Sequence, residues 1–164
     1  MTTMKTEIAF ILDRSGSMSS ITGAAISGYN EFLAAQQATV DDHGKPIPAT
    51  FSLILFDQEY LPIYNRVPIQ SAEPLTLQTY VPRGSTALLD AIGHTIDTIG
   101  SELANTPEAD RPSKVIVAIL TDGEENSSAR YSMAEINQRI THQTRKYSWE
   151  FLFLAACRTS LFQL

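Results

Sequence analysis

The sequence has only one cysteine, Cys157, among its 164 residues. An internal disulfide needs two cysteines, so nothing in the sequence marks an oxidising compartment, and we interpret Cys157 as a structural residue. Basic runs are also lacking, because the twelve lysines and arginines are scattered and the formal net charge is −6. This charge argues against a nucleic-acid backbone or an anionic membrane as the partner.

Long apolar runs are missing as well. The run nearest the N-terminus covers residues 8–12 and ends at Asp13, which is too short for the apolar region of a signal peptide. No other stretch is long and apolar enough to cross a bilayer. The composition, with 43% hydrophobic and 18% charged residues, is that of an ordinary globular protein. The sequence therefore predicts one cytoplasmic domain spanning residues 1–164.

Short apolar segments alternate with helical patterns along the chain. Continuous apolar runs, typical of strands buried on both faces, occupy residues 7–12, 49–57, 114–120 and 149–156. Residues 60–69 form a further strand whose two prolines suit a sheet edge. Apolar residues at helical spacing mark residues 21–33, 88–103 and 133–140, the last after a capping box of Ser132 and Glu135. The alternation predicts an α/β fold with a mostly parallel sheet and one antiparallel edge strand.

Polar side chains follow these segments at three places. Asp13, Ser15 and Ser17 come directly after the first strand, Thr86 lies where a loop enters a helix, and Asp122 follows the most apolar strand. Functional sites in α/β folds gather at the carboxyl ends of the strands. All five side chains offer oxygen, which suits Mg²⁺, Mn²⁺ or Ca²⁺ better than zinc or copper.

The spacing and charge of these residues also indicate a function. Alternate side chains of an extended segment point to one side, which would bring Asp13, Ser15 and Ser17 together, and Gly16 lets the backbone turn closely around an ion. Asp13 and Asp122 carry the only two negative charges of the set. A divalent ion held this way stays electrophilic and can accept a carboxylate from another molecule.

Each motif also has a structural interpretation when taken alone. Ser85 and Thr86 fit a helix N-cap, Asp122 with Gly123 fits a turn, and the Asp-x-Ser-x-Ser segment fits a helix start. The occurrence of all three after the expected elements favours a metal site. The three histidines are distant from these loops in sequence, and we interpret them as surface or packing residues; they are His43, His94 and His142.

The three motifs together resemble the metal-ion-dependent adhesion site of the von Willebrand factor type A (VWA) family. They read "DRSGSM" at residues 13–18, "GSTAL" at residues 84–88 and "TDGEEN" at residues 121–126. The likeness extends over roughly residues 5–156. Among members of the family, the chain looks most like bacterial or phage intracellular ones.

The resemblance implies a Rossmann-like three-layer α/β/α fold that binds one Mg²⁺ or Mn²⁺. By position, Ser15 and Ser17 would bind the metal through their hydroxyls, and Thr86 directly or through water. Asp13 and Asp122 would hold coordinated waters and the serine hydroxyls. The implied activity is protein binding without catalysis, in which an Asp or Glu of a partner protein completes the coordination.

The chain departs from the family pattern at its end. Family members usually continue with a helix and often a sixth strand, whereas only residues 157–164 follow the last strand here. A C-terminal helix and strand would thus be missing. An uncovered apolar edge favours self-association, so we expect a homo-oligomer.

Two other functional interpretations stay open at the sequence level. In a haloacid-dehalogenase-like phosphatase, Asp13 would be the nucleophile and Asp122 would bind Mg²⁺. Ser15 stands where those enzymes carry a second aspartate, and Lys114 is a weak candidate for their lysine. Alternatively, the metal site could be vestigial.

Four further residues near the motifs each have two possible roles. Asp57 either approaches the site from the neighbouring strand or serves an edge loop. Arg83 either attracts an acidic ligand or is a solvated loop cation. Glu124 and Glu125 either make the rim of the site selective or only solvate it.

Overall fold

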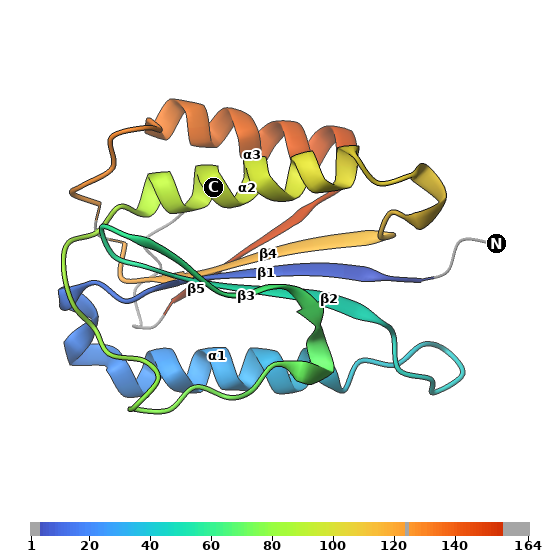
Figure 1. Cartoon of the computed structure of the whole chain (residues 1–164), viewed down its shortest axis with the longest axis horizontal. Coiled ribbons are helices and arrows are strands. Elements are labelled where there is room, and N and C mark those ends of the chain that lie inside the picture. Colours follow the sequence, from blue (N-terminus) through green and yellow to red (C-terminus); the bar gives the residue numbers. More distant parts are fainter. Residues whose placement is uncertain (1–3, 124, 156–164) are drawn as a thin grey trace.

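Five strands form one sheet between helices in the computed structural model of the chain, which describes residues 4–123 and 125–155 (Figure 1). The strands are β1 (Thr6–Asp13), β2 (Ala49–Phe56), β3 (Tyr60–Pro68), β4 (Lys114–Thr121) and β5 (Glu150–Ala155). Their order across the sheet is β3-β2-β1-β4-β5, and β3 alone of these runs antiparallel to its neighbour. The mostly parallel sheet with one antiparallel edge strand is therefore confirmed.

Helices cover both faces of this sheet. They are α1 (Thr22–Gln37), α2 (Leu88–Ala104) and α3 (Met133–Tyr147). The short 3₁₀ turns are η1 (Gly16–Ile21), η2 (Ile69–Ser71) and η3 (Glu108–Asp110). Helix α1 lies on one face, and α2 and α3 lie together on the other (Figure 1). This is the expected three-layer α/β/α arrangement.

The strand pattern follows from burial. Strand β1 lies between β2 and β4 and is covered by helices on both faces, so residues 8–12 are all fully buried. A strand in this position needs a continuous apolar run rather than alternation. Strand β3 lies at the edge, where Pro62 and Pro68 remove no essential hydrogen bond from the sheet.

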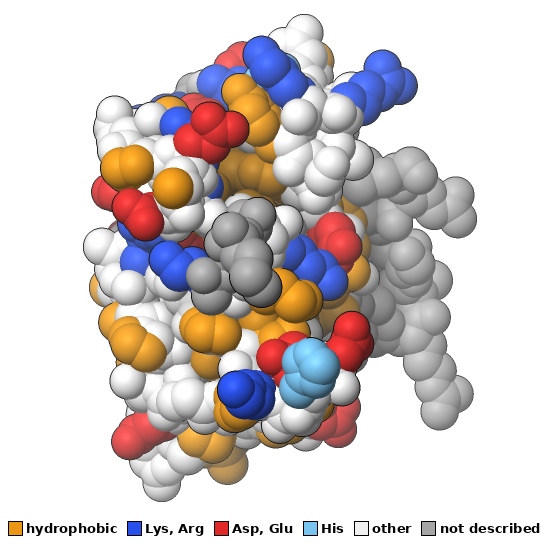
Figure 2. Space-filling view, turned by 90° about the vertical axis from the view of Figure 1, so that its right-hand side faces the viewer, with side chains coloured by type: hydrophobic (Ala, Val, Ile, Leu, Met, Phe, Trp, Pro, Cys, Tyr) orange, Lys and Arg blue, Asp and Glu red, His pale blue; other side chains and the backbone are white. Residues whose placement is uncertain are grey.

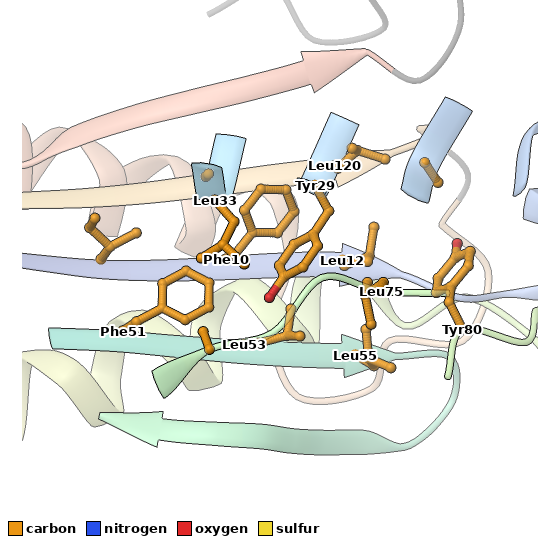
Figure 3. Packing of buried hydrophobic residues seen from close by; sticks show 14 of the residues in the cluster. Phe10, Leu12, Tyr29, Leu33, Phe51, Leu53, Leu55, Leu75, Tyr80 and Leu120 are labelled. Carbon is orange, nitrogen blue, oxygen red and sulfur yellow. The ribbon is translucent and has the colours of Figure 1, made fainter. Parts of the chain in front are cut away.

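The face under α1 has an aromatic core. The rings of Phe10 and Tyr29 meet edge to face, with centroids 5.1 Å apart and an interplanar angle of 83° (Figure 3). Phe32 approaches Phe10 in the same way at 5.2 Å. Figure 3 shows how the side chains of β1 and β2 meet α1 in this layer. Helix α1 is thus fixed by ring packing of a kind that stabilises protein interiors.

The opposite face packs α2 and α3 against the sheet. Apolar residues of α2 cover Ile11 and Ile119. The expected cap of α3 is confirmed, because the hydroxyl of Ser132 accepts a hydrogen bond from the Glu135 amide at 3.2 Å. The expected apolar face of α3 is partly wrong. Met133 is 48% exposed, because it is the first residue of the helix and the buried face starts one turn later.

Several expectations concern residues outside the described ranges. Glu124, Cys157 and the tail 157–164 fall there.

No helix in the described ranges has the length and apolar character that crossing a membrane requires. Figure 2 views the molecule at the amino ends of the parallel strands, where acidic and basic side chains are interspersed with apolar ones.

Two buried tyrosines provide a test of the core. Tyr29 and Tyr80 are each at most 1% exposed, but only the hydroxyl of Tyr80 has a described partner, the backbone carbonyl of Asp13. We expect Tyr29→Phe to keep or raise the free energy of unfolding, by up to about 1 kcal/mol, because it removes an unpaired polar atom. Tyr80→Phe should lower it by about 1–2 kcal/mol. Urea unfolding measures both, and equal losses would contradict the assignment.

Candidate metal centre

The three sequence motifs meet at the carboxyl end of the sheet. Asp13 is the last residue of β1, and Asp122 follows β4 on the neighbouring strand. Thr86 lies two residues before α2, in the segment that reaches the same end of the molecule at the left of Figure 1. The topology thus brings together loops that lie far apart in the sequence.

Asp13 is the centre of this arrangement. Its side chain is fully buried, with Oδ1 accepting from the Ser15 amide and Oδ2 from the Thr121 hydroxyl, both at 2.7 Å. Burial raises the pKa of Asp13, the hydrogen bonds from Ser15 and Thr121 oppose this, and the nearby charge of Asp122 raises the pKa further. Two carboxylates therefore lie close enough to repel each other.

Ser15 and Ser17 present their hydroxyls side by side. Their Oγ atoms are 3.1 Å apart, and Ser15 is 1% exposed. The expectation that residues 13–17 form one extended segment is wrong. Asp13 and Ser15 are extended, but Ser17 belongs to the 3₁₀ turn η1, in which the Met18 amide donates to the Ser15 carbonyl. The hydroxyls meet because the chain turns.

Two glycines allow the loops to approach. The Gly16 amide donates to the Gly84 carbonyl at 2.9 Å, and a Cβ on Gly16 would lie 3.3 Å from that oxygen. Gly84 has a φ of +75°, and a Cβ there would lie 2.1 Å from Oε1 of Gln58. The same Gln58 oxygen accepts from the Ser85 amide. Close contact between the first two motifs therefore depends on missing side chains.

Thr86 is held by the loop that follows β4. It is 1% exposed, its amide donates to Oδ1 of Asn126 at 2.8 Å, and its carbonyl accepts from the amides of Asn126 and Ser127 at 2.9 Å each. The hydroxyl of Ser127 also donates to that of Ser85 at 2.8 Å. The second motif is therefore joined by two hydrogen bonds to Asn126, the last residue of the third motif, and by two more to Ser127, which follows it.

The same loop caps helix α2 from outside. The side chain of Glu125 accepts from the Leu89 amide at 3.1 Å, and the Ser128 hydroxyl accepts from the Asp90 amide at 3.0 Å. The N-cap position is Ala87, so the interpretation of Ser85 and Thr86 as caps is wrong. Glu125 is a capping residue, a role that sequence spacing could not reveal because the cap comes from a distant loop.

Asp57 lies beside the first two motifs. It is fully buried, and its Oδ2 is 2.8 Å from Nε of Arg83 and 3.2 Å from Nε of Arg14. The contact with Arg83 is a hydrogen bond, while that with Arg14 is an ion pair only. Both interpretations left open for Asp57 are observed. Its Oδ2 contacts the arginines next to the first two motifs, while its Oδ1 accepts a hydrogen bond from the Glu59 amide at 2.6 Å in the turn between β2 and β3. Arg83 is paired, and it also contacts Glu59.

The donor chemistry fits a hard divalent ion. Within residues 4–123 and 125–155 no group of three or more histidine, cysteine or acidic side chains could hold a metal. The three histidines are exposed, and the His94 ring contacts the Tyr60 ring with centroids 4.2 Å apart and an interplanar angle of 59°. Hydroxyls and carboxylates remain, and both described partners of the Asp13 carboxylate are neutral donors. A cation beside this buried charge would relieve its cost of burial.

Gly84 provides a test of the loop geometry. We expect Gly84→Ala to lower the free energy of unfolding by about 1–3 kcal/mol, because alanine disfavours a positive φ and would collide with Gln58. Gly23 is the matched control: it lies in α1, and a Cβ there meets nothing within 4 Å. Gly23→Ala should raise stability by about 0.5–1 kcal/mol. Similar behaviour of the two variants in urea unfolding would argue against the described loop.

Comparison with known proteins bears on the fold. No protein-family model matches the sequence, and no curated protein matches it either. Among solved structures, the ArnB paralog VWA2 from Sulfolobus acidocaldarius matches with a TM-score of 0.51 and 16% identity, over 94% of this chain and 35% of that one. Proximal thread matrix protein 1 from the mussel byssus matches with a TM-score of 0.55 and 16% identity, over 93% of this chain and 36% of that one.

The chain spans about a third of the length of these two proteins. At such low identity the similarity bears on the fold alone. It agrees with the mostly parallel sheet flanked by helices described above. The resemblance found in the sequence is thereby confirmed: the chain has the fold of a von Willebrand factor type A domain.

Proposed function

We propose that this chain is a divalent-metal-dependent protein-binding module and not an enzyme. The observation that carries the proposal is that three loops joined by hydrogen bonds meet at the end of the sheet that holds the fully buried carboxylate of Asp13, whose described partners are neutral. VWA domains commonly bind a divalent metal and serve in protein interactions, which supports the same function. The metal would be Mg²⁺ or Mn²⁺, the ions that suit oxygen ligands with few charges.

The residues divide into two groups by charge. The hydroxyls of Ser15, Ser17 and Thr86 would contact the metal. Asp13 and Asp122 would hold its waters and supply the two negative charges that balance it. In this role Asp13 also orients the first motif, because its Oδ1 accepts the Ser15 amide. The same carboxylate ties β1 to β4 through Thr121.

The charge count indicates what the partner offers. Neutral hydroxyls leave a divalent ion strongly electrophilic, and the bound metal would supply a coordination position for an incoming carboxylate. We therefore propose a protein partner that presents an Asp or Glu side chain. The net charge of −6 favours a protein over a nucleic acid or an anionic membrane.

The geometry supports binding over phosphoryl transfer. A nucleophilic carboxylate needs an accessible oxygen, but Asp13 is fully buried and both of its oxygens accept hydrogen bonds. Lys114, the weak candidate for a phosphatase lysine, starts β4, whereas Asp13 ends the adjacent parallel strand β1. Lys114 therefore lies at the other end of the sheet and pairs with Glu150 at 3.6 Å.

Metal binding can be measured by calorimetry. We expect the metal-stripped protein to bind one Mg²⁺ or Mn²⁺ with millimolar or tighter affinity. Asp13→Ala and Ser17→Ala should weaken binding by about tenfold or more, because each removes a group that holds the ion or its waters. Ser19→Ala is the control, because this exposed serine lies two residues after Ser17 and directly follows the motif. Equal affinity in all four proteins would place the metal elsewhere.

Partner chemistry can be tested on a peptide array. We expect retention of peptides bearing Asp or Glu in Mg²⁺ buffer, with loss of signal in a chelator and on replacement by Asn or Gln. Retention that ignores both changes would contradict the proposal. Metal-dependent hydrolysis of a generic phosphate ester that disappears in Asp13→Asn would instead show a phosphatase.

A further inference from the structure

We propose that Asp57 is a positioning residue of the metal site, which sets the distance between the loop carrying Ser15 and Ser17 and the loop carrying Thr86. The inference rests on the function proposed above. Asp57 follows β2, belongs to neither loop and lies in no metal-binding motif of the sequence. Its buried carboxylate is nevertheless the point at which both loops are held.

Each loop contributes one arginine to this contact. Arg14 stands between Asp13 and Ser15, and Arg83 precedes Thr86 by three residues. One oxygen of Asp57, Oδ2, pairs with both guanidinium groups, at 3.2 and 2.8 Å. Because the carboxylate is fully buried and Arg14 is only 14% exposed, solvent screens this pairing much less than a surface ion pair.

The backbone supports the same geometry. The Asp57 carbonyl accepts from the Ala87 amide at 2.9 Å, next to Thr86, and Phe56 accepts from the Arg14 amide at 2.8 Å. The Arg83 amide in turn donates to the Arg14 carbonyl at 2.7 Å. These bonds hold the loops near the end of β2, where the buried Asp57 carboxylate contacts an arginine of each loop from inside and the exposed Glu59 carboxylate contacts the same two arginines from outside.

Charge makes the carboxylate hard to replace. Arg14 and Arg83 bring two positive charges close to a proposed cation site, and Asp57 neutralises one of them from inside. Glu59 is the outer partner, 2.8 Å from Arg83, but it is 62% exposed and lies 4.0 Å from Arg14. Without Asp57 the two guanidinium groups would repel each other and separate the loops that carry the metal ligands.

Glu7 offers a matched control within the same sheet. It is also a buried carboxylate, 1% exposed, and it pairs with Arg66 at 2.7 Å. It lies near the start of β1, whereas Asp13 lies at the end of that strand, so the two sites are at opposite ends of the sheet. Loss of either carboxylate removes the buried partner of an arginine and leaves that arginine with an exposed glutamate only, but Asp57 adjoins the metal loops and Glu7 does not.

The test titrates Mn²⁺ alone into four metal-stripped proteins and follows the free ion by electron paramagnetic resonance. The proteins are the wild type, Asp13→Ala, Asp57→Asn and Glu7→Gln, each at a temperature where circular dichroism shows it folded. We expect Asp57→Asn to weaken Mn²⁺ binding by about tenfold and to alter the spectrum of the bound ion. Glu7→Gln should lower the melting temperature yet keep the wild-type affinity and spectrum.

Arg83→Gln provides a second variant, for the case in which Asp57→Asn does not fold. Arg83 is 51% exposed, so its loss perturbs the core less, and it should weaken Mn²⁺ binding by about two- to fivefold. Wild-type affinity for Mn²⁺ in Asp57→Asn would overturn the role of Asp57 and leave the metal site intact. If Asp57→Asn does not fold, wild-type affinity for Mn²⁺ in Arg83→Gln would have the same meaning. Failure of the wild type to bind Mn²⁺ would overturn the proposed function itself.

Discussion

A negative charge buried at the end of the central strand is the constraint on which the rest of this structure depends. Asp13 is fully buried between two neighbouring strands, and a carboxylate in such a place needs donors on every side. The Ser15 amide and the Thr121 hydroxyl supply them, which bends the chain after β1 and ties it to β4. The Tyr80 hydroxyl also holds the Asp13 carbonyl, so the end of β1 is fixed through both main chain and side chain.

The loops around Asp13 hold one another in place through hydrogen bonds. The loop after β4 holds Thr86 through Asn126 and caps α2 through Glu125. The loop before α2 in turn accepts the Gly16 amide. In the described parts of these loops, polar contacts from one loop to the other replace the backbone hydrogen bonds that a helix or strand would provide. Such mutual support would pre-organise the metal site proposed above.

The sheet explains why such loops meet at all. Parallel strands with their helices on both faces deliver the ends of β1, β2 and β4 to one edge, and the apolar cores on the two faces hold that edge in place. The aromatic packing of Phe10 with Tyr29 and Phe32 stabilises α1, which follows the first motif directly through η1. Core packing and site geometry are therefore parts of one arrangement, in which the strands set the positions and the loops supply the chemistry.

Much of this arrangement could be predicted from local sequence patterns. The unbroken apolar run of residues 8–12 could belong only to a strand buried on both faces, and Pro62 and Pro68 excluded β3 from the centre of the sheet. The oxygen-bearing residues after β1 and β4 were also recognisable, because they directly follow the two apolar runs in the sequence.

Only the tertiary structure decided which distant segments contact each other. The turn that brings Ser17 beside Ser15, the cap of α2 by Glu125 and the pairing of Asp57 with two arginines each join groups whose spacing carries no periodic signal. Polar contacts of this kind depend on where the loops meet in space, and the packing of the sheet and its helices determines that.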